Sequence, residues 1–168
     1  MKLPADAAQP YRVERVHVAV AVRGRRIGVA IAGADGLLRV LGCRPRTGYS
    51  APELPAARLL ERIVRRGNVE RLITEHTPEP SRTASRAVAL TTELAAEHHG
   101  LPFDSVACRD LTASFLPDAT TTVVPLLRQL LVVFPELSHL TFLRVPKKAQ
   151  IAKLVAAALA IRSVQLHS

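Results

Sequence analysis

The segment from residue 18 to residue 38 constrains the fold more than any other part of the chain. It holds two short apolar runs, VAVAV at 18–22 and IGVAIA at 27–32, joined by the turn sequence RGRR. Short runs rich in Val and Ile that are separated by a Gly-containing turn are typical of a β-hairpin near the centre of a sheet. A buried amphipathic helix is the alternative, but the runs are too short for it, and Gly24 and Gly28 interrupt the pattern. We therefore predict a central hairpin.

Length and composition favour a single α/β domain. A chain of 168 residues is long enough for one domain with its own core and too short for two. Aromatic residues make up only 4% of the sequence, so Ala, Val, Leu and Ile must build that core. Short apolar strands mixed with Ala-rich helical stretches indicate an α/β fold. Residues 1–15 are rich in Pro and Ala, and we expect them to be loose.

The remaining predicted elements alternate between strand and helix. A strand, a helix and a further strand at this spacing predict a right-handed parallel crossover. A nearly all-apolar stretch then interrupts the alternation before a closing helix begins. We predict strands at 37–43, 69–76, 101–107 and 140–145, and helices at 52–67, 81–99, 123–134 and 147–165.

The charge balance favours a polyanionic partner. Lys and Arg outnumber Asp and Glu by 23 to 14, which gives a formal net charge of +9. A basic surface of this size attracts nucleic acid and makes the affinity depend on salt, although the same charge also serves solubility. The arginines gather in the hairpin turn and on one side of the predicted helix 52–67. The candidate phosphate-binding residues are Arg23, Arg25, Arg26, Arg58, Arg62, Arg65 and Arg66.

The cysteines and the terminal sequence exclude several classes of protein. Cys43 and Cys108 lie far apart and have no metal-ligand neighbours in the sequence, so we expect reduced thiols and no metal site. The first residues contain no apolar stretch that can act as a signal peptide. No run reaches the roughly 18 uninterrupted apolar residues of a membrane span. We expect a cytoplasmic protein without a membrane partner.

Two segments carry a resemblance to a known family. RRIGVAIA at 25–32 and QIAKLVAAALAIRSVQL at 150–166 resemble the opening hairpin and the closing helix of RuvC/YqgF-type proteins, which belong to the ribonuclease-H-like superfamily. The resemblance implies one domain over residues 16–168, with a mixed sheet flanked by helices and an inserted apolar helical segment around 113–145. Such families include Holliday-junction resolvases and nucleases that trim ribosomal RNA precursors. Branched DNA or structured RNA is therefore the implied partner.

The same resemblance locates the positions of the family's catalytic acids. Nucleases of this type hold two divalent ions between carboxylates from the first strand, the neighbouring strand and the closing helix. At these positions this sequence has Ala21, then Glu75, then Lys153 in the YqgF register or Ala157 in the RuvC register. One matched carboxylate cannot hold two ions, and an ammonium at the helical position repels them.

From these positions we predict binding of nucleic acid without metal-dependent cleavage, and no cofactor. We further hypothesise that Lys153 and Glu75 form an ion pair in the former metal pocket. Two alternatives stay open. In the first, the protein is an active nuclease that rebuilds a Mg or Mn site from Glu75, Asp110 in the motif CRDLT, or Asp118. Alternatively, it is an interaction scaffold, or a homodimer, that uses the apolar segment 123–134. The sequence does not distinguish DNA from RNA.

Overall fold

The predicted hairpin is present at the centre of the fold. The computed structural model describes residues 14–43, 53–66, 68–76, 83–118 and 122–168, so nearly all of the segment predicted to be loose lies outside it. Strands β1 (Val16–Arg23) and β2 (Arg26–Gly33) pair in antiparallel register, with Val20 opposite Val29. The turn between them contains Gly24 at a φ of +60°, a conformation that glycine adopts without steric cost.

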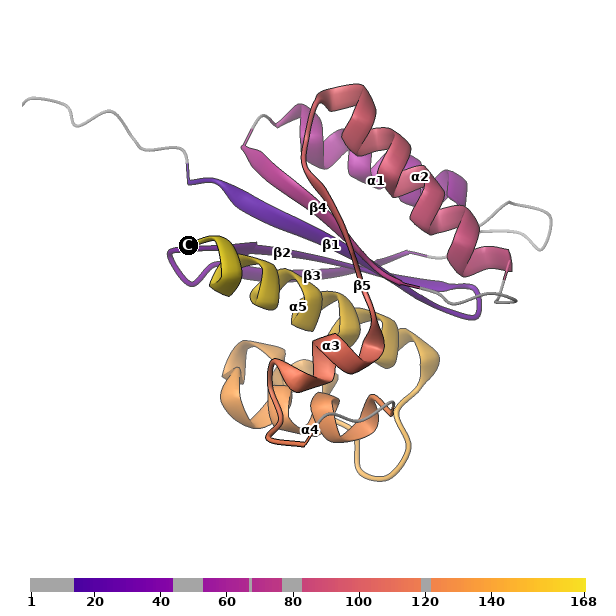
Figure 1. Ribbon diagram of the computed structural model, residues 1–168. Coiled ribbons are helices and arrows are strands. Elements are labelled where there is room, and N and C mark those ends of the chain that lie inside the picture. The colour runs from indigo at the N-terminus through magenta and orange to yellow at the C-terminus, as the bar shows by residue number, and fades with distance from the viewer. Residues whose placement is uncertain (1–13, 44–52, 67, 77–82, 119–121) are drawn as a thin grey trace, which may run out of the picture.

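The hairpin belongs to a five-stranded mixed sheet with the strand order β3-β2-β1-β4-β5 (Figure 1). Strand β2 runs antiparallel to both β1 and β3 (Leu38–Cys43). Strands β4 (Val69–Glu75) and β5 (Phe103–Val106) run parallel to β1. The sheet confirms the predicted α/β class, and it places the carboxyl ends of β1 and β4 side by side.

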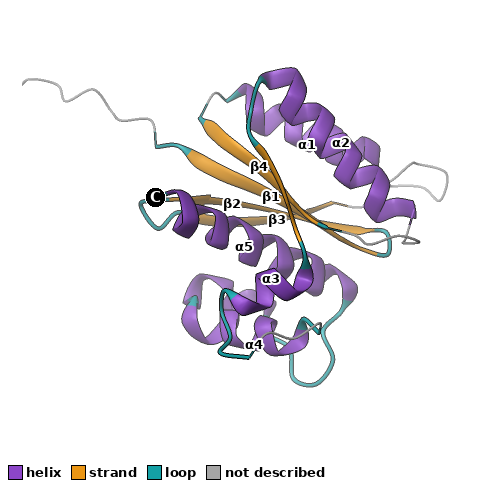
Figure 2. Ribbon diagram, viewed as in Figure 1, coloured by secondary structure: helices purple, strands orange, loops and turns teal. Residues whose placement is uncertain are grey.

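Helices cover both faces of the sheet (Figure 2). Helices α1 (Glu53–Arg65) and α2 (Thr83–His99) lie on one face, and α5 (Lys148–His167) lies on the other. A further helical layer covers the side of α5 that faces away from the sheet. It contains the short helix α3 (Cys108–Ala113), α4 (Val124–Val133) and the 3-10 helix η1 (Pro135–Leu140).

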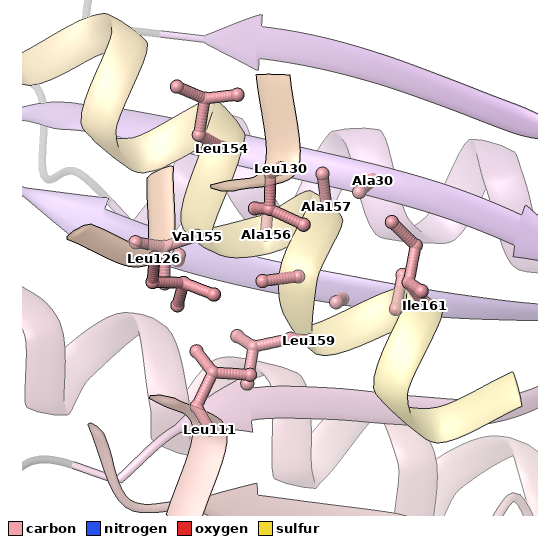
Figure 3. Packing of buried hydrophobic residues seen from close by; sticks show 14 of the residues in the cluster. Ala30, Leu111, Leu126, Leu130, Leu154, Val155, Ala156, Ala157, Leu159 and Ile161 are labelled. Atoms are coloured by element: carbon pink, nitrogen blue, oxygen red, sulfur yellow. The ribbon is translucent and has the colours of Figure 1, made fainter. Parts of the chain in front are cut away.

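Close packing of α5 on the sheet depends on small residues. The Ala-rich stretch of α5 faces Ala19, Ala21 and Ala30 of the hairpin, as the close-up of this core shows for Ala30 and Ala157 (Figure 3). A Cβ atom built on Gly28 would lie 2.3 Å from the carbonyl carbon and oxygen of Ala152. Only glycine therefore fits at this position of β2.

The opposite side of α5 is covered by α3 and α4, through Leu111, Leu126 and Leu130 (Figure 3). Apolar neighbours on both sides explain why the stretch of α5 from residue 154 to residue 161 is apolar around its whole circumference. Within the described residues, α5 is the one helix long and apolar enough to cross a membrane, and 56% of its apolar window is buried inside the fold.

Of the two elements predicted in the inserted segment, the helix is present and the strand is not. Helix α4 confirms the helix predicted at 123–134, and it buries Leu126, Leu127 and Leu130 in the core, whereas Val132 and Val133 are exposed. The strand predicted at 140–145 is wrong. Residues 141–147 form an irregular loop between η1 and α5. They lie on the side of α5 away from the sheet, so no strand edge is available for pairing.

A buried histidine on β1 predicts a pH-dependent stability. His17 is 4% exposed, and its Nδ1 atom lies 2.7 Å from the Ser163 hydroxyl on α5. Burial lowers the pKa of His17 below its usual value of 6.5, although the nearby charge of Glu70 opposes this effect.

Because the pKa of His17 is lower in the folded state than in the unfolded chain, this imidazole binds more protons in the unfolded chain as the pH falls through about 6.5. We expect the free energy of unfolding to fall as the pH is lowered from about 7.5 to about 5.5. Urea titrations across this range measure the slope. The His17→Gln variant should show a flatter profile, and an equally steep profile would assign the slope to other groups.

Candidate functional site

The candidate site lies where β1 and β4 end on the face of the sheet that α5 covers. Side chains alternate along a strand, so Ala19, Ala21 and Arg23 of β1 share this face. The parallel register pairs Ala19 with Ile73, which places Glu75 beside Ala21 on the same face. Ala21, which the resemblance predicts at the position of the first acid, is thus a buried methyl group next to Glu75.

Arg23 holds Glu75 in a bidentate ion pair. Its Nη1 atom donates to Oε2 at 2.5 Å, and its Nη2 atom donates to Oε1 at 3.0 Å. Nη1 also donates to the carbonyl oxygen of Val22 at 2.8 Å. Only 15% of the Arg23 side chain and 17% of the Glu75 side chain are exposed. Paired, charge-assisted bonds of this geometry fix both groups and occupy both carboxylate oxygens.

The hypothesis that Lys153 pairs with Glu75 is therefore wrong, because Arg23 takes that role. The Lys153 side chain lies instead over the edge strand β3. A Cβ atom on Gly42 of β3 would be 2.6 Å from its Cε atom. The physical cause is the contact between Gly28 and the backbone of Ala152, which sets the rotation of α5 and directs residue 153 toward β3.

A second lysine of α5 lies against the hairpin turn. A Cβ atom on Gly24 would be 3.2 Å from the Nζ atom of Lys148. The first turn of α5 and the turn of the hairpin thus present their cations together. We call this surface the basic end of the sheet; it comprises Arg25, Arg26, Lys148 and Lys153.

The other predicted acids do not join Glu75. Asp110 is exposed in the first turn of α3, where its carbonyl oxygen accepts a bond from the Ser114 hydroxyl, and Asp118 is also exposed. The α3 residue whose electrostatics depend on Glu75 is Cys108. Burial raises the pKa of the Cys108 thiol, and the charge of Glu75 raises it further, while Arg23 acts in the opposite direction.

These residues do not fit a pair of divalent ions. Ala21 offers no donor atom, and both oxygens of Glu75 are occupied by a guanidinium. Helix α5 contains no Asp or Glu at any position, so neither register of the closing helix supplies a carboxylate. Across the described parts of the chain, no three His, Cys, Asp or Glu side chains form a cluster that could hold a metal ion.

The predicted phosphate-binding arginines fall on separate surfaces. Arg23 belongs to the ion pair, whereas Arg25 and Arg26 belong to the basic end. The arginines of the first helix are exposed on the opposite side of the sheet from α5 (Figure 1). One of them, Arg65, bonds to Glu61 one turn earlier at 2.8 Å. The α1 arginines are Arg58, Arg62 and Arg65, and Arg66 directly follows the helix.

Sequence reasoning missed the Arg23–Glu75 pair and Lys148. The strand alternation already contained the signal for the pair, because Arg23 lies two residues after Ala21 and therefore on its face. No comparable signal marked Lys148, since its position depends on how closely α5 approaches the turn.

Comparison with known proteins identifies the fold. No family model and no curated protein matches the sequence. The structure of Thermus thermophilus RuvC matches with a TM-score of 0.62 at 11% identity, covering 90% of this chain and 96% of that chain. The structure of T. thermophilus RuvC in complex with Holliday junction substrate matches with a TM-score of 0.56 at 10% identity, with the same coverage. The fold is therefore ribonuclease-H-like and of the RuvC type.

Proposed function

Since the chain has a ribonuclease-H-like fold of the RuvC type, we propose that it binds branched DNA or structured RNA and does not cleave it by two-metal chemistry. The matched RuvC structures include a complex with a Holliday junction, which supports nucleic acid as the partner class. The formal net charge of +9 supports the same class, because phosphates attract such a surface.

The observation that carries the proposal is the ion pair between Arg23 and Glu75 beside Ala21. A carboxylate that keeps a metal must offer its oxygens, and Arg23 occupies both. The Arg23 guanidinium supplies, next to the largely buried Glu75 carboxylate, the positive charge that a metal ion would bring. Removing Arg23 would leave the Glu75 carboxylate unpaired at low exposure, so the pair contributes to the fold rather than to hydrolysis.

The binding surface in this proposal is the basic end of the sheet. Cations from the hairpin turn and from α5 meet there, beside the carboxyl end of β1 where Arg23 and Glu75 lie. Phosphate oxygens are the natural acceptors for several Lys and Arg side chains on one surface. The bound strand then lies over a site that positions the backbone but lacks the carboxylates for hydrolysis.

Binding and cleavage of a labelled four-way DNA junction and of a structured RNA hairpin test the proposal. We expect binding that weakens steeply between about 50 and 200 mM salt, and no products with Mg²⁺ or Mn²⁺. Cleavage that depends on Mn²⁺ and disappears in Glu75→Gln would establish the active-nuclease alternative. Failure to bind either ligand at low salt would leave the scaffold alternative.

A further inference from the structure

The loop between η1 and α5, residues 141–147, presents two large apolar side chains to solvent. Leu143 is 94% exposed and Val145 is 84% exposed, the highest values for large apolar residues in the described part of the chain. Arg144, which is also exposed, lies between them. Neither apolar residue contributes to the core, so the core does not explain them.

Both ends of this loop are fixed to the fold. On one side, Phe142 is half-buried and lies under the guanidinium of Arg128, whose carbon is 6.0 Å from the ring centroid. On the other side, Pro146 is buried, and the backbone N–H of Lys147 donates to the Gln150 side chain at 2.8 Å. The three residues at the tip therefore project from an anchored base.

Gln150 also ties the two ends of the loop together. Its side-chain amide donates to the carbonyl oxygens of Leu140 and Thr141 at 3.4 and 3.3 Å. One side chain thus connects the end of η1 with the start of α5. A loop held in this way loses little conformational freedom when its tip binds a partner, which favours binding.

The charges around the tip select the partner. From residue 137 to residue 168 the sequence contains no Asp or Glu. The cations in this stretch begin at the tip and continue into the basic end of the sheet. They are Arg144, Lys147, Lys148 and Lys153, whereas the last cation of the stretch, Arg162, lies near the other end of α5 and donates to the Ser114 hydroxyl. An apolar tip whose nearest charged neighbours in the sequence are cations complements the stacked bases and phosphates of a nucleic acid.

We propose that Leu143 and Val145 insert between bases at the branch point of the bound nucleic acid and so distinguish branched from continuous duplex. This inference rests on the proposed function and adds the element that selects the ligand. Apolar side chains inserted between base steps must overcome base stacking. That cost is lowest where stacking is already interrupted. A branch point offers such a step, whereas a continuous duplex does not.

The test compares the wild type with the double variant Leu143→Ser/Val145→Ser. The ligands are a four-way DNA junction with 2-aminopurine next to the branch point and a linear duplex of the same arm sequence. For the wild type we expect tighter binding to the junction and a rise in 2-aminopurine fluorescence as the base unstacks. For the variant we expect about a tenfold loss of the preference for the junction, with no fluorescence rise. Its affinity for the duplex and its salt dependence should be unchanged, since the cations remain.

The pair Val132→Ser/Val133→Ser supplies the matched control. These residues are also exposed and apolar, but they lie at the end of α4, and their replacement should change neither readout. If Leu143→Ser/Val145→Ser keeps both the preference and the fluorescence rise, the inference is overturned while the proposed function stands. If the wild type binds neither ligand at low salt, the proposed function itself fails.

Apolar tips flanked by cations also enter lipid surfaces, so a second experiment tests whether the tip binds a membrane. Sedimentation with vesicles of phosphatidylcholine and phosphatidylserine measures this directly. Vesicle binding that the double variant loses, together with unchanged junction binding, would overturn the inference. No vesicle binding by the wild type, with junction preference lost in the variant, supports it.

Discussion

The Gly28→Ala variant is expected to lose about 3 kcal/mol or more of its free energy of unfolding. The added methyl carbon would lie 2.3 Å from the carbonyl group of Ala152 and 2.5 Å from the backbone nitrogen of Lys153. These are backbone atoms of α5, so no side-chain rotation relieves the clash. Helix α5 cannot move away easily, because α3 and α4 cover its other side. Urea unfolding followed by circular dichroism measures the loss.

Gly36→Ala is the matched control for this prediction. Gly36 has a φ of +88°, and a Cβ atom there would meet nothing within 4 Å. Only backbone strain is expected, which costs about 1 to 2 kcal/mol. A Gly28→Ala variant no less stable than Gly36→Ala would show that the helix does not approach β2 as closely as described.

The second large effect concerns charge at the basic end of the sheet. The triple variant Arg25→Gln/Arg26→Gln/Lys148→Gln is expected to bind a four-way junction more weakly by a factor on the order of 100 at about 0.1 M salt. With each phosphate contact that is lost, binding releases fewer counterions. The magnitude of the slope of log affinity against log salt should therefore also fall by about 0.9 per residue. Fluorescence anisotropy titrations at several salt concentrations measure both quantities.

A triple variant on the other side of the sheet controls for total charge. Arg58→Gln/Arg62→Gln/Arg66→Gln also removes three positive charges, but from exposed positions on and directly after α1. We expect its affinity to change by less than about threefold, since these groups act only through the long-range field. A larger loss in this variant than in the first would move the interface from the basic end to α1.

The fold could be predicted from the sequence because its central elements are locally consistent. The hairpin combines β-branched residues with a glycine turn, and each later helix that was predicted correctly shows its own apolar spacing. The segment at 140–145 shows the limit of this reasoning. Its composition favours a strand, but α5 separates it from the sheet, so tertiary context overrides propensity.

The candidate site was predictable only in part. The assignment of Ala21 to the position of an acid rests on the resemblance and stays a prediction, whereas its place beside Glu75 is given by the pairing of β1 with β4. The partner of Glu75 did not follow, because it depends on where α5 sits on the sheet. The contact at Gly28 directs Lys153 toward Gly42 and leaves Arg23 to pair with the carboxylate. Helix rotation of this kind is set by a single close contact that no periodic pattern encodes.

The position of α5 between two layers also affects how the chain folds during translation. Helix α5 follows every other described element in the sequence, yet it fills the middle of the structure. Until residues 148–167 leave the ribosome, the alanine face of the hairpin and the leucines of α4 have no cover. The hairpin therefore keeps an uncovered apolar face while residues 34–147 are synthesised, and the leucines of α4 join it only shortly before α5 enters between the two surfaces.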